Sequence, residues 1–259
     1  MTDGLRVEVD GPVATLTLDR PDSLNALTVP VKVAIREALD SIAVDRAVRV
    51  VILTGAGRAF CAGQDLAERE EPDAAPLDVE VRDRYNPIIR ALRSMGQPVI
   101  AAVNGVAAGA GASLAFACDI RIAADEARFM LAFGRIGLVP DSGATWFLPR
   151  LVGPARAAEL ALLGDAVDAS EALRLGLVSR VVPGDQLMTQ ARGVADRLAD
   201  GAPLALSLTK GALERALTID LDEALEGEAK LQGIAGASAD HAEGLAAFRE
   251  KRPPRFTGS

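Results

Sequence analysis

The amino-acid sequence predicts an α/β fold, with a parallel sheet at its core and a helical region at the C-terminal end. Over the first 200 residues, short apolar runs typical of buried strands alternate with helical patterns. Hydrophobic residues make up 49% of the 259 positions, enough to bury a large core. From residue 184 onward only helical periodicity remains. We therefore expect a core over residues 1–200 and a helical region over residues 201–259.

The N-terminal segment predicts a β-hairpin followed by a loop and a helix. Residues 5–9 and 13–18 alternate apolar and polar side chains around the turn pair Asp10-Gly11. Residues 20–27 are typical of a loop. Thr28 is a good N-cap for the helix that follows, whose apolar residues recur at three- and four-residue spacing.

Two further strands and one helix are predicted in the next stretch. Residues 49–54 and 98–103 are continuous apolar runs of strand length. Residues 67–80 carry many charges and two prolines, which indicates a mobile surface loop or lid. A helix is expected over residues 81–94.

The second half of the chain moves from strands to helices. Residues 120–123 and 178–182 are predicted as strands, and residues 142–151 and 154–163 as helices. Further helices are expected over residues 184–199, 203–217, 220–235 and 239–250.

Two stretches of small residues follow predicted strands. The first runs from Phe60 to Asp65 and the second from Asn104 to Ala112. Gly and Ala let backbone N–H groups approach a ligand closely, and the second stretch leads into a predicted helix, whose N-terminus favours negative charge. Two such sources of N–H groups would form an oxyanion hole, which suits the stabilisation of an enolate.

Composition excludes several classes of function. The net charge of −8 argues against nucleic-acid binding, which needs a basic surface. His241 is the only histidine and lies in a polar stretch, so a metal site or a Ser-His-Asp triad is not expected. Cys61 and Cys118 are interpreted as reduced thiols. No signal peptide or membrane-spanning run is recognised, so we expect a cytoplasmic protein.

Four motifs resemble the crotonase, or enoyl-CoA hydratase/isomerase, family. They extend over nearly the whole chain in family order and spacing: Arg20-Pro21 with Asn25-Ala26-Leu27, Thr54 to Leu66, Pro98 to Gly111, and Gly137 to Asp141. The resemblance implies a crotonase-like spiral of β-β-α units. It also implies that residues 201–259 take part in oligomerisation, as a homotrimer or a dimer of trimers.

The resemblance further implies an acyl-CoA thioester as substrate and no cofactor apart from the coenzyme A that the substrate carries. In the family, two backbone N–H groups bind the thioester oxygen, and the matching residues here are Gln64 and Ala110. Other positions that match substrate-binding residues are Asn25, Ala26, Ala62, Gly63, Asp65, Leu66, Tyr85, Gly109 and Phe133.

The acid–base residues depart from the hydratase pattern. A hydratase of this family uses two glutamates, and Ser113 and Phe133 stand at those positions here. Neither side chain can exchange a proton near neutral pH, whereas hydration needs two groups that do. Asp141 stands where related isomerases carry an aspartate, and one carboxylate is enough to move a proton and a double bond. In an apolar pocket its pKa would rise.

The resemblance therefore favours an isomerase that converts a 3-enoyl-CoA to a 2-enoyl-CoA, 1,2-epoxyphenylacetyl-CoA to an oxepin-CoA, or both. Residues 85–87 and 139–143 are similar to those of the isomerases that act on the epoxide in bacterial phenylacetate degradation. An enoyl-CoA hydratase and a non-catalytic acyl-CoA-binding homologue remain as alternatives. Asp141 is also a candidate N-cap of the helix predicted from residue 142.

Two other activities fit the residues less well. A hydrolytic dehalogenase would use Asp141 as nucleophile, but it needs a histidine within residues 81–94, and that segment has none. The stretches Gly55-Ala56-Gly57 and Gly109-Ala110-Gly111 both follow strands, but the third glycine of a dinucleotide-binding G-x-G-x-x-G motif is missing from each.

Overall fold

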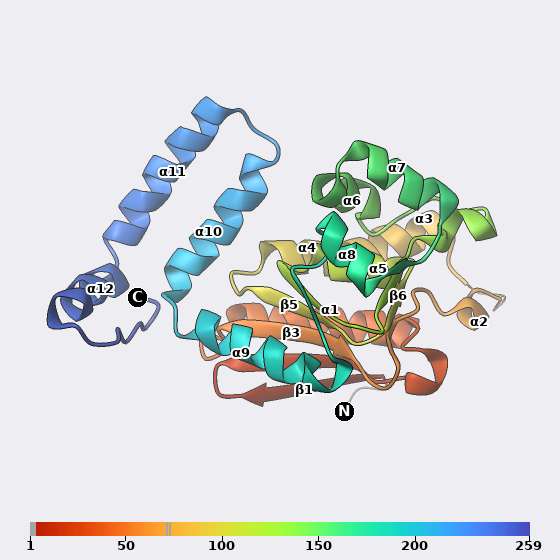
Figure 1. The fold of residues 1–259 in the computed structure, drawn as a ribbon, viewed down its shortest axis with the longest axis horizontal. Coiled ribbons are helices and arrows are strands. Elements are labelled where there is room, and N and C mark those ends of the chain that lie inside the picture. Colours follow the sequence, from red (N-terminus) through yellow and green to blue (C-terminus); the bar gives the residue numbers. More distant parts are fainter. Residues whose placement is uncertain (1–3, 71, 73) are drawn as a thin grey trace.

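The computed structural model describes residues 4–70, 72 and 74–259 and contains two β-sheets (Figure 1). The six-stranded sheet has the order β1-β2-β3-β5-β7-β10 and the four-stranded sheet the order β4-β6-β8-β9. The strands are β1 (Leu5–Asp10), β2 (Val13–Leu18), β3 (Val50–Gly55), β4 (Ala59–Cys61), β5 (Val99–Val103), β6 (Val106–Ala108), β7 (Ile120–Ala124), β8 (Arg128–Met130), β9 (Val167–Asp168) and β10 (Arg180–Val182).

The expected hairpin is confirmed, since β1 pairs antiparallel with β2, and the rest of the six-stranded sheet is parallel. Alternate residues of each buried strand enter two different apolar clusters. In β3, Val51 and Leu53 belong to the larger cluster, and Val50 and Ile52 to the smaller one. This is the pattern of a sheet covered on both faces.

A repeated unit links the two sheets. β3, β5 and β7 each turn within a few residues into a short strand of the small sheet, namely β4, β6 and β8, which pair in parallel with one another. Helices follow these short strands. The predicted spiral of β-β-α units is thus confirmed, although the four strands of the small sheet were not predicted individually.

Helices cover both faces of the large sheet (Figure 1). α9 packs on the outer face, while α1, α4 and α5 lie on the face toward the small sheet. The α-helices are α1 (Val29–Val44), α2 (Leu66–Arg69), α3 (Leu77–Glu80), α4 (Asn86–Ser94), α5 (Ala110–Ala117), α6 (Ala144–Val152), α7 (Pro154–Leu163), α8 (Ala169–Leu175), α9 (Leu187–Ala199), α10 (Pro203–Ala216), α11 (Leu221–Gly236) and α12 (Ala239–Glu250).

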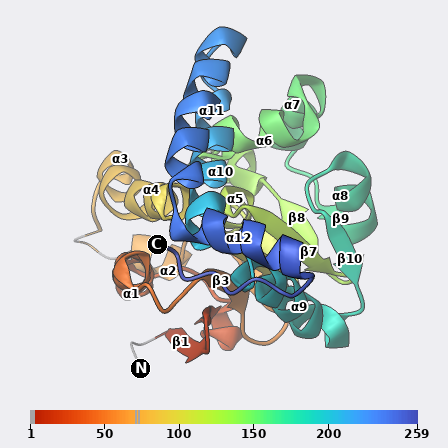
Figure 2. The same ribbon diagram turned by 90° about the vertical axis from the view of Figure 1, so that its left-hand side faces the viewer.

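The C-terminal helices form an arm beside the core (Figures 1 and 2). α10 and α11 lie side by side and extend away from the sheets, and α12 packs near their base. Lys210 of α10 anchors the arm, since its ammonium group donates to the carbonyls of Leu92 (2.8 Å) and Gln97 (3.0 Å). Arg49 holds the carbonyl of Phe256 at 2.7 Å.

Several boundaries differ from the prediction. Thr28 occupies the N-cap position of α1, but its side chain makes no capping hydrogen bond. The predicted loop over residues 67–80 contains part of α2 and all of α3, and a π-helical turn over residues 81–85 joins α3 to α4. Glu71 and Asp73 of the predicted lid lie outside the described residues, as do the first three residues of the chain.

Candidate active site

The first glycine loop is held against the loop that precedes α1. The N–H of Leu27 donates to the carbonyl of Gly63 at 2.7 Å, and the N–H of Ala62 donates to the carbonyl of Leu24 at 3.0 Å. Asn25, predicted to bind substrate, is 1% exposed, and its amide bonds the carbonyls of Ala56 (2.9 Å) and Ala59 (2.7 Å). Asn25 therefore shapes the loop from inside.

Gly63 brings the two glycine stretches into contact. Its φ is +92°, a conformation that side chains rarely adopt. A Cβ atom at this position would lie 2.9 Å from the carbonyl oxygen of Ala108 and 3.3 Å from the nitrogen of Ala110. Only glycine allows this close approach, so the residue that follows it, Gln64, is placed next to the N-terminus of α5.

Two backbone donors are free at this junction. Among the described residues, neither the N–H of Gln64 nor that of Ala110 donates to a protein acceptor. Ala110 is the first residue of α5, where the helix leaves its N–H groups unpaired and the dipole favours negative charge. Both N–H groups are therefore free to donate to a ligand.

Asp141 lies beside the first turn of α5. The Ser113 hydroxyl of α5, which is fully buried, contacts the carbonyl of Asp141 at 3.1 Å and that of Gly109 at 3.3 Å. A Cβ atom on Gly109 would lie 3.8 Å from the ring of Phe133. The residues predicted from the second glycine stretch and from the turn before α6 are thus brought together.

Burial raises the pKa of the Asp141 carboxyl above its usual value, and the hydrogen bond from Ser142 partly opposes this effect. That bond joins the Ser142 hydroxyl to Asp141 Oδ1 at 2.9 Å. Ser142 is itself 2% exposed and has a positive φ of 52°, so the turn is strained in a way that is common at functional sites.

The interpretation of Asp141 as a helix cap is wrong. α6 begins at Ala144 rather than at residue 142, and its N-cap residue is Gly143. The backbone carbonyl of Asp141 accepts the N–H of Ala144 at 2.9 Å, but the carboxylate makes no capping hydrogen bond. The carboxylate is therefore available for chemistry.

Some predicted binding residues also have partners within the protein. Asp65 is the N-cap of α2, accepting from the N–H of Ala67, and it pairs with Arg20 at 2.8 Å. Leu66 is 57% exposed, and Ala26 accepts a hydrogen bond from Arg20 at 2.7 Å. Arg20 therefore links the loop before α1 to the start of α2.

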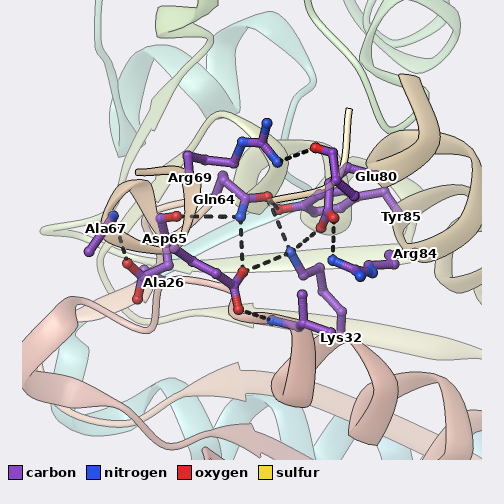
Figure 3. A network of polar contacts seen from close by, with 12 residues as sticks. Ala26, Lys32, Gln64, Asp65, Ala67, Arg69, Glu80, Arg84 and Tyr85 are labelled. Carbon is purple, nitrogen blue, oxygen red and sulfur yellow. Dashed lines mark hydrogen bonds and ion pairs between the residues drawn. The ribbon is translucent and has the colours of Figure 1, made fainter. Parts of the chain in front are cut away.

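A buried polar cluster under Gln64 was not predicted from the sequence (Figure 3). Tyr85, one of the predicted pocket residues, donates from its hydroxyl to the side-chain oxygen of Gln64 at 2.6 Å. Lys32 and Glu80 lie beside this pair. Lys32 lies in a predicted helix and Glu80 in a predicted loop, and no local signal marks either as buried.

Within the described part of the chain, no three His, Cys, Asp or Glu side chains are grouped as a metal site would require. The described helices are also too short or too polar to cross a membrane.

Comparison with known proteins adds a family to this geometry. The family model described as enoyl-CoA hydratase/isomerase matches residues 8–259. The 1,2-epoxyphenylacetyl-CoA isomerase of Escherichia coli is 46% identical over 96% of this chain and 97% of its own length. A Rhodobacter capsulatus protein named "Probable enoyl-CoA hydratase" is also 46% identical, over 98% of both chains.

A solved structure of the same family has the same fold as this chain. The crystal structure of an enoyl-CoA hydratase from Bacillus anthracis superimposes with a TM-score of 0.96 at 36% identity, covering 99% of this chain and 100% of that one.

Proposed function

The chain belongs to the enoyl-CoA hydratase/isomerase family, and on that premise we propose that it is an acyl-CoA isomerase with one catalytic carboxylate, Asp141. The observation that carries the proposal is a half-buried Asp141 beside Ser113, with Ser113 and Phe133 at the positions where hydratases have glutamates. Adding water needs a second proton-transfer group, and these two side chains cannot supply it.

The proposed mechanism begins with the thioester oxygen of the acyl-CoA in the oxyanion hole formed by the N–H groups of Gln64 and Ala110. These two hydrogen bonds make the adjacent carbon more acidic, because they stabilise the negative charge that its deprotonation places on the oxygen. The Asp141 carboxylate removes that proton and becomes a neutral acid. It then returns the proton to a different carbon of the dienolate, so no other reactant is consumed.

Two substrates fit this proton shift. A 3-enoyl-CoA would lose a proton from the carbon beside the thioester and gain one two carbons beyond it, giving the conjugated 2-enoyl-CoA. In 1,2-epoxyphenylacetyl-CoA, the substrate in the name of the E. coli relative, the methylene would lose the proton and a ring carbon would gain it as the oxepin forms. Turnover of each purified CoA ester, followed by mass-resolved chromatography, tests the proposal. Absence of turnover with both CoA esters would contradict the proposal.

Asp141 should set the acid limb of the pH–rate profile. The base acts only when ionised, so kcat/KM is expected to fall as pH drops through the raised pKa of Asp141. The substitution Ser142→Ala removes a hydrogen bond that lowers this pKa. The acid limb should therefore move to higher pH in the variant. An unmoved limb would show that another group titrates.

We further propose that the C-terminal arm assembles the protein as a homotrimer or a dimer of trimers. Large apolar side chains are exposed along this arm: Leu213, Leu217, Leu221, Leu225, Ile234, Leu245 and Phe248. So many apolar groups on one arm are typical of an interface.

Charging this arm should therefore break the assembly. Light scattering should give three or six chain masses for the parent protein and a smaller species for the double variant Leu213→Lys with Phe248→Glu. Replacing the exposed Val44 by Lys on α1 is the control. A parent protein that runs as a monomer would contradict the proposal.

A further inference from the structure

Six polar residues form a cluster behind the first glycine loop, buried at its centre and partly exposed at its edge (Figure 3). We call it the Lys32 cluster, and its members are Lys32, Gln64, Glu68, Glu80, Arg84 and Tyr85. The side chain of Lys32 is 0% exposed and that of Glu80 is 3% exposed. Charged groups as buried as these are costly to desolvate, and well-packed apolar residues would often be at least as stable. Their geometry therefore calls for a functional explanation.

The side-chain amide of Gln64 is held at both ends. Its oxygen accepts from the Tyr85 hydroxyl at 2.6 Å and from the Lys32 ammonium at 3.2 Å. Its nitrogen donates to Glu68 Oε2 at 3.3 Å and to the Asp65 carbonyl at 3.4 Å. These four contacts restrain the side-chain amide of Gln64 and, through it, the backbone to which it is attached.

Lys32 joins this amide to two other helices. Its ammonium group pairs with Glu80 at the end of α3 and lies 3.5 Å from Glu68 of α2. Glu68 also accepts the N–H of Val29, at the start of α1, at 2.7 Å. Arg84 pairs with the second oxygen of Glu80. The cluster thus contains two cations and two anions, and its charges cancel.

Because the charges cancel, the cluster exerts little net electrostatic attraction on a negative charge that develops in the site. We therefore expect its effect to come from how it positions the backbone of Gln64. The peptide between Gly63 and Gln64 carries the proposed donor N–H. Its carbonyl accepts the N–H of Leu27, and the next N–H along the chain, that of Asp65, donates to the carbonyl of Leu27 at 3.2 Å. Neither bond involves the N–H of Gln64, and the glycine before it allows the peptide to rotate more freely than any other residue would. The side chain of Gln64 adds a further attachment on the other side of the loop.

We propose that Lys32 is a positioning residue of the oxyanion hole and that it acts through the side-chain amide of Gln64, with Tyr85 as a second holder of the same oxygen. This inference rests on the proposed function, since it takes the N–H of Gln64 as one of the two donors. A donor displaced by a fraction of an ångström forms a weaker hydrogen bond. The loss is larger for the charged enolate oxygen than for the neutral carbonyl of the bound substrate, so turnover suffers more than binding.

The test measures the carbonyl of a bound ligand directly. A saturated acyl-CoA with ¹³C in its thioester carbonyl binds without reacting, and infrared difference spectroscopy reports how far hydrogen bonding lowers the C=O stretching frequency. We expect a clear downshift in the parent protein and a smaller one in Lys32→Met. With substrate, kcat should fall about 10–100-fold while KM changes little, as for a misplaced oxyanion donor.

Lys210→Met is the matched control. Lys210 is the other buried lysine among the described residues, 7% exposed in its side chain, and it bonds backbone carbonyls and Asp119 away from this loop. This variant should lose thermal stability, yet keep the parent protein's carbonyl downshift and its kcat. An equal loss of downshift in both variants would show that Lys32 acts through stability alone, and would overturn the inference.

A double-mutant cycle tests the route through Gln64. Gln64→Met keeps the backbone N–H but removes every side-chain hydrogen bond, so Lys32→Met should have no further effect on the downshift in that background. If Lys32→Met does not fold, the carbonyl downshift is measured in Gln64→Met and Tyr85→Phe. A downshift equal to that of the parent protein in both variants would overturn the inference. A parent protein that shows neither downshift nor turnover would instead contradict the proposed function.

Discussion

Replacing Asp141 by Asn is expected to lower kcat for isomerisation by about 10²–10⁴-fold, the usual contribution of a general base. The amide of Asn has nearly the same shape and can still accept the hydrogen bond from Ser142, but it cannot take a proton from carbon. Stopped-flow or steady-state rates with a 3-enoyl-CoA would measure the loss, and calorimetry with an unreactive acyl-CoA would measure binding.

Binding and stability serve as the controls for this variant. The affinity for acyl-CoA should be retained, because the two backbone donors are untouched. Since burial raises the folded-state pKa of Asp141, the folded protein holds this proton more tightly than the unfolded chain, so stability falls as pH rises through the raised pKa. The Asn variant escapes this effect and should unfold at no lower a temperature than the parent at neutral pH. Retained turnover would show that a group other than Asp141 acts as the base.

Removing the N–H of Ala110 should have the second-largest effect. Ala110→Pro deletes this donor, and proline is tolerated at the first position of a helix, where the N–H has no intrahelical partner. The loss of one oxyanion-hole donor lowers kcat by about 10²–10³-fold. Steady-state kinetics and the carbonyl stretch of a bound acyl-CoA would both report it.

Ala110→Gly is the matched control, because it changes the same residue but keeps the N–H. It should retain most of the activity and the full carbonyl downshift. Circular dichroism on both variants checks that α5 remains folded. If the proline variant keeps the parent protein's rate while folded, the N–H of Ala110 does not bind the reacting oxygen.

The fold was largely predictable because its signals are local. The hairpin around Asp10-Gly11, the buried strands and the C-terminal helices each show their own periodicity. The strands β4, β6, β8 and β9 have two or three residues each, too few for any period to be recognised. Their pairing depends on turns between the two sheets and therefore on tertiary structure.

The site was predictable in part for the same reason. Gly63 and Gly109 are distinctive in sequence because both have a positive φ, which favours glycine, and Gly63 also lies in close contact with the backbone of Ala108. The helix start at residue 142, with Asp141 as its cap, was predicted wrongly because Asp-Ser-Gly is a common capping pattern. The strained φ of Ser142 moves the start of α6 to Ala144 and frees the carboxylate.

The Lys32 cluster could not be predicted from the sequence. Lys32 stands outside the apolar face that defines α1 in the sequence, and its polar partners come from segments 32–48 residues away in the chain. Only the tertiary arrangement shows that Gln64, Glu68 and Glu80 converge on one ammonium group and that Tyr85 bonds the same Gln64 oxygen.

The central claim, that one carboxylate makes this protein an isomerase rather than a hydratase, is tested most directly by the ratio of two rates on the same purified sample. One is the conjugation of a 3-enoyl-CoA, seen as rising ultraviolet absorbance, and the other is the hydration of the matching 2-enoyl-CoA, seen as falling absorbance. We predict clear conjugation with little hydration. Brisk hydration would contradict the claim, because Asp141 or another acid would then activate water without the two glutamates.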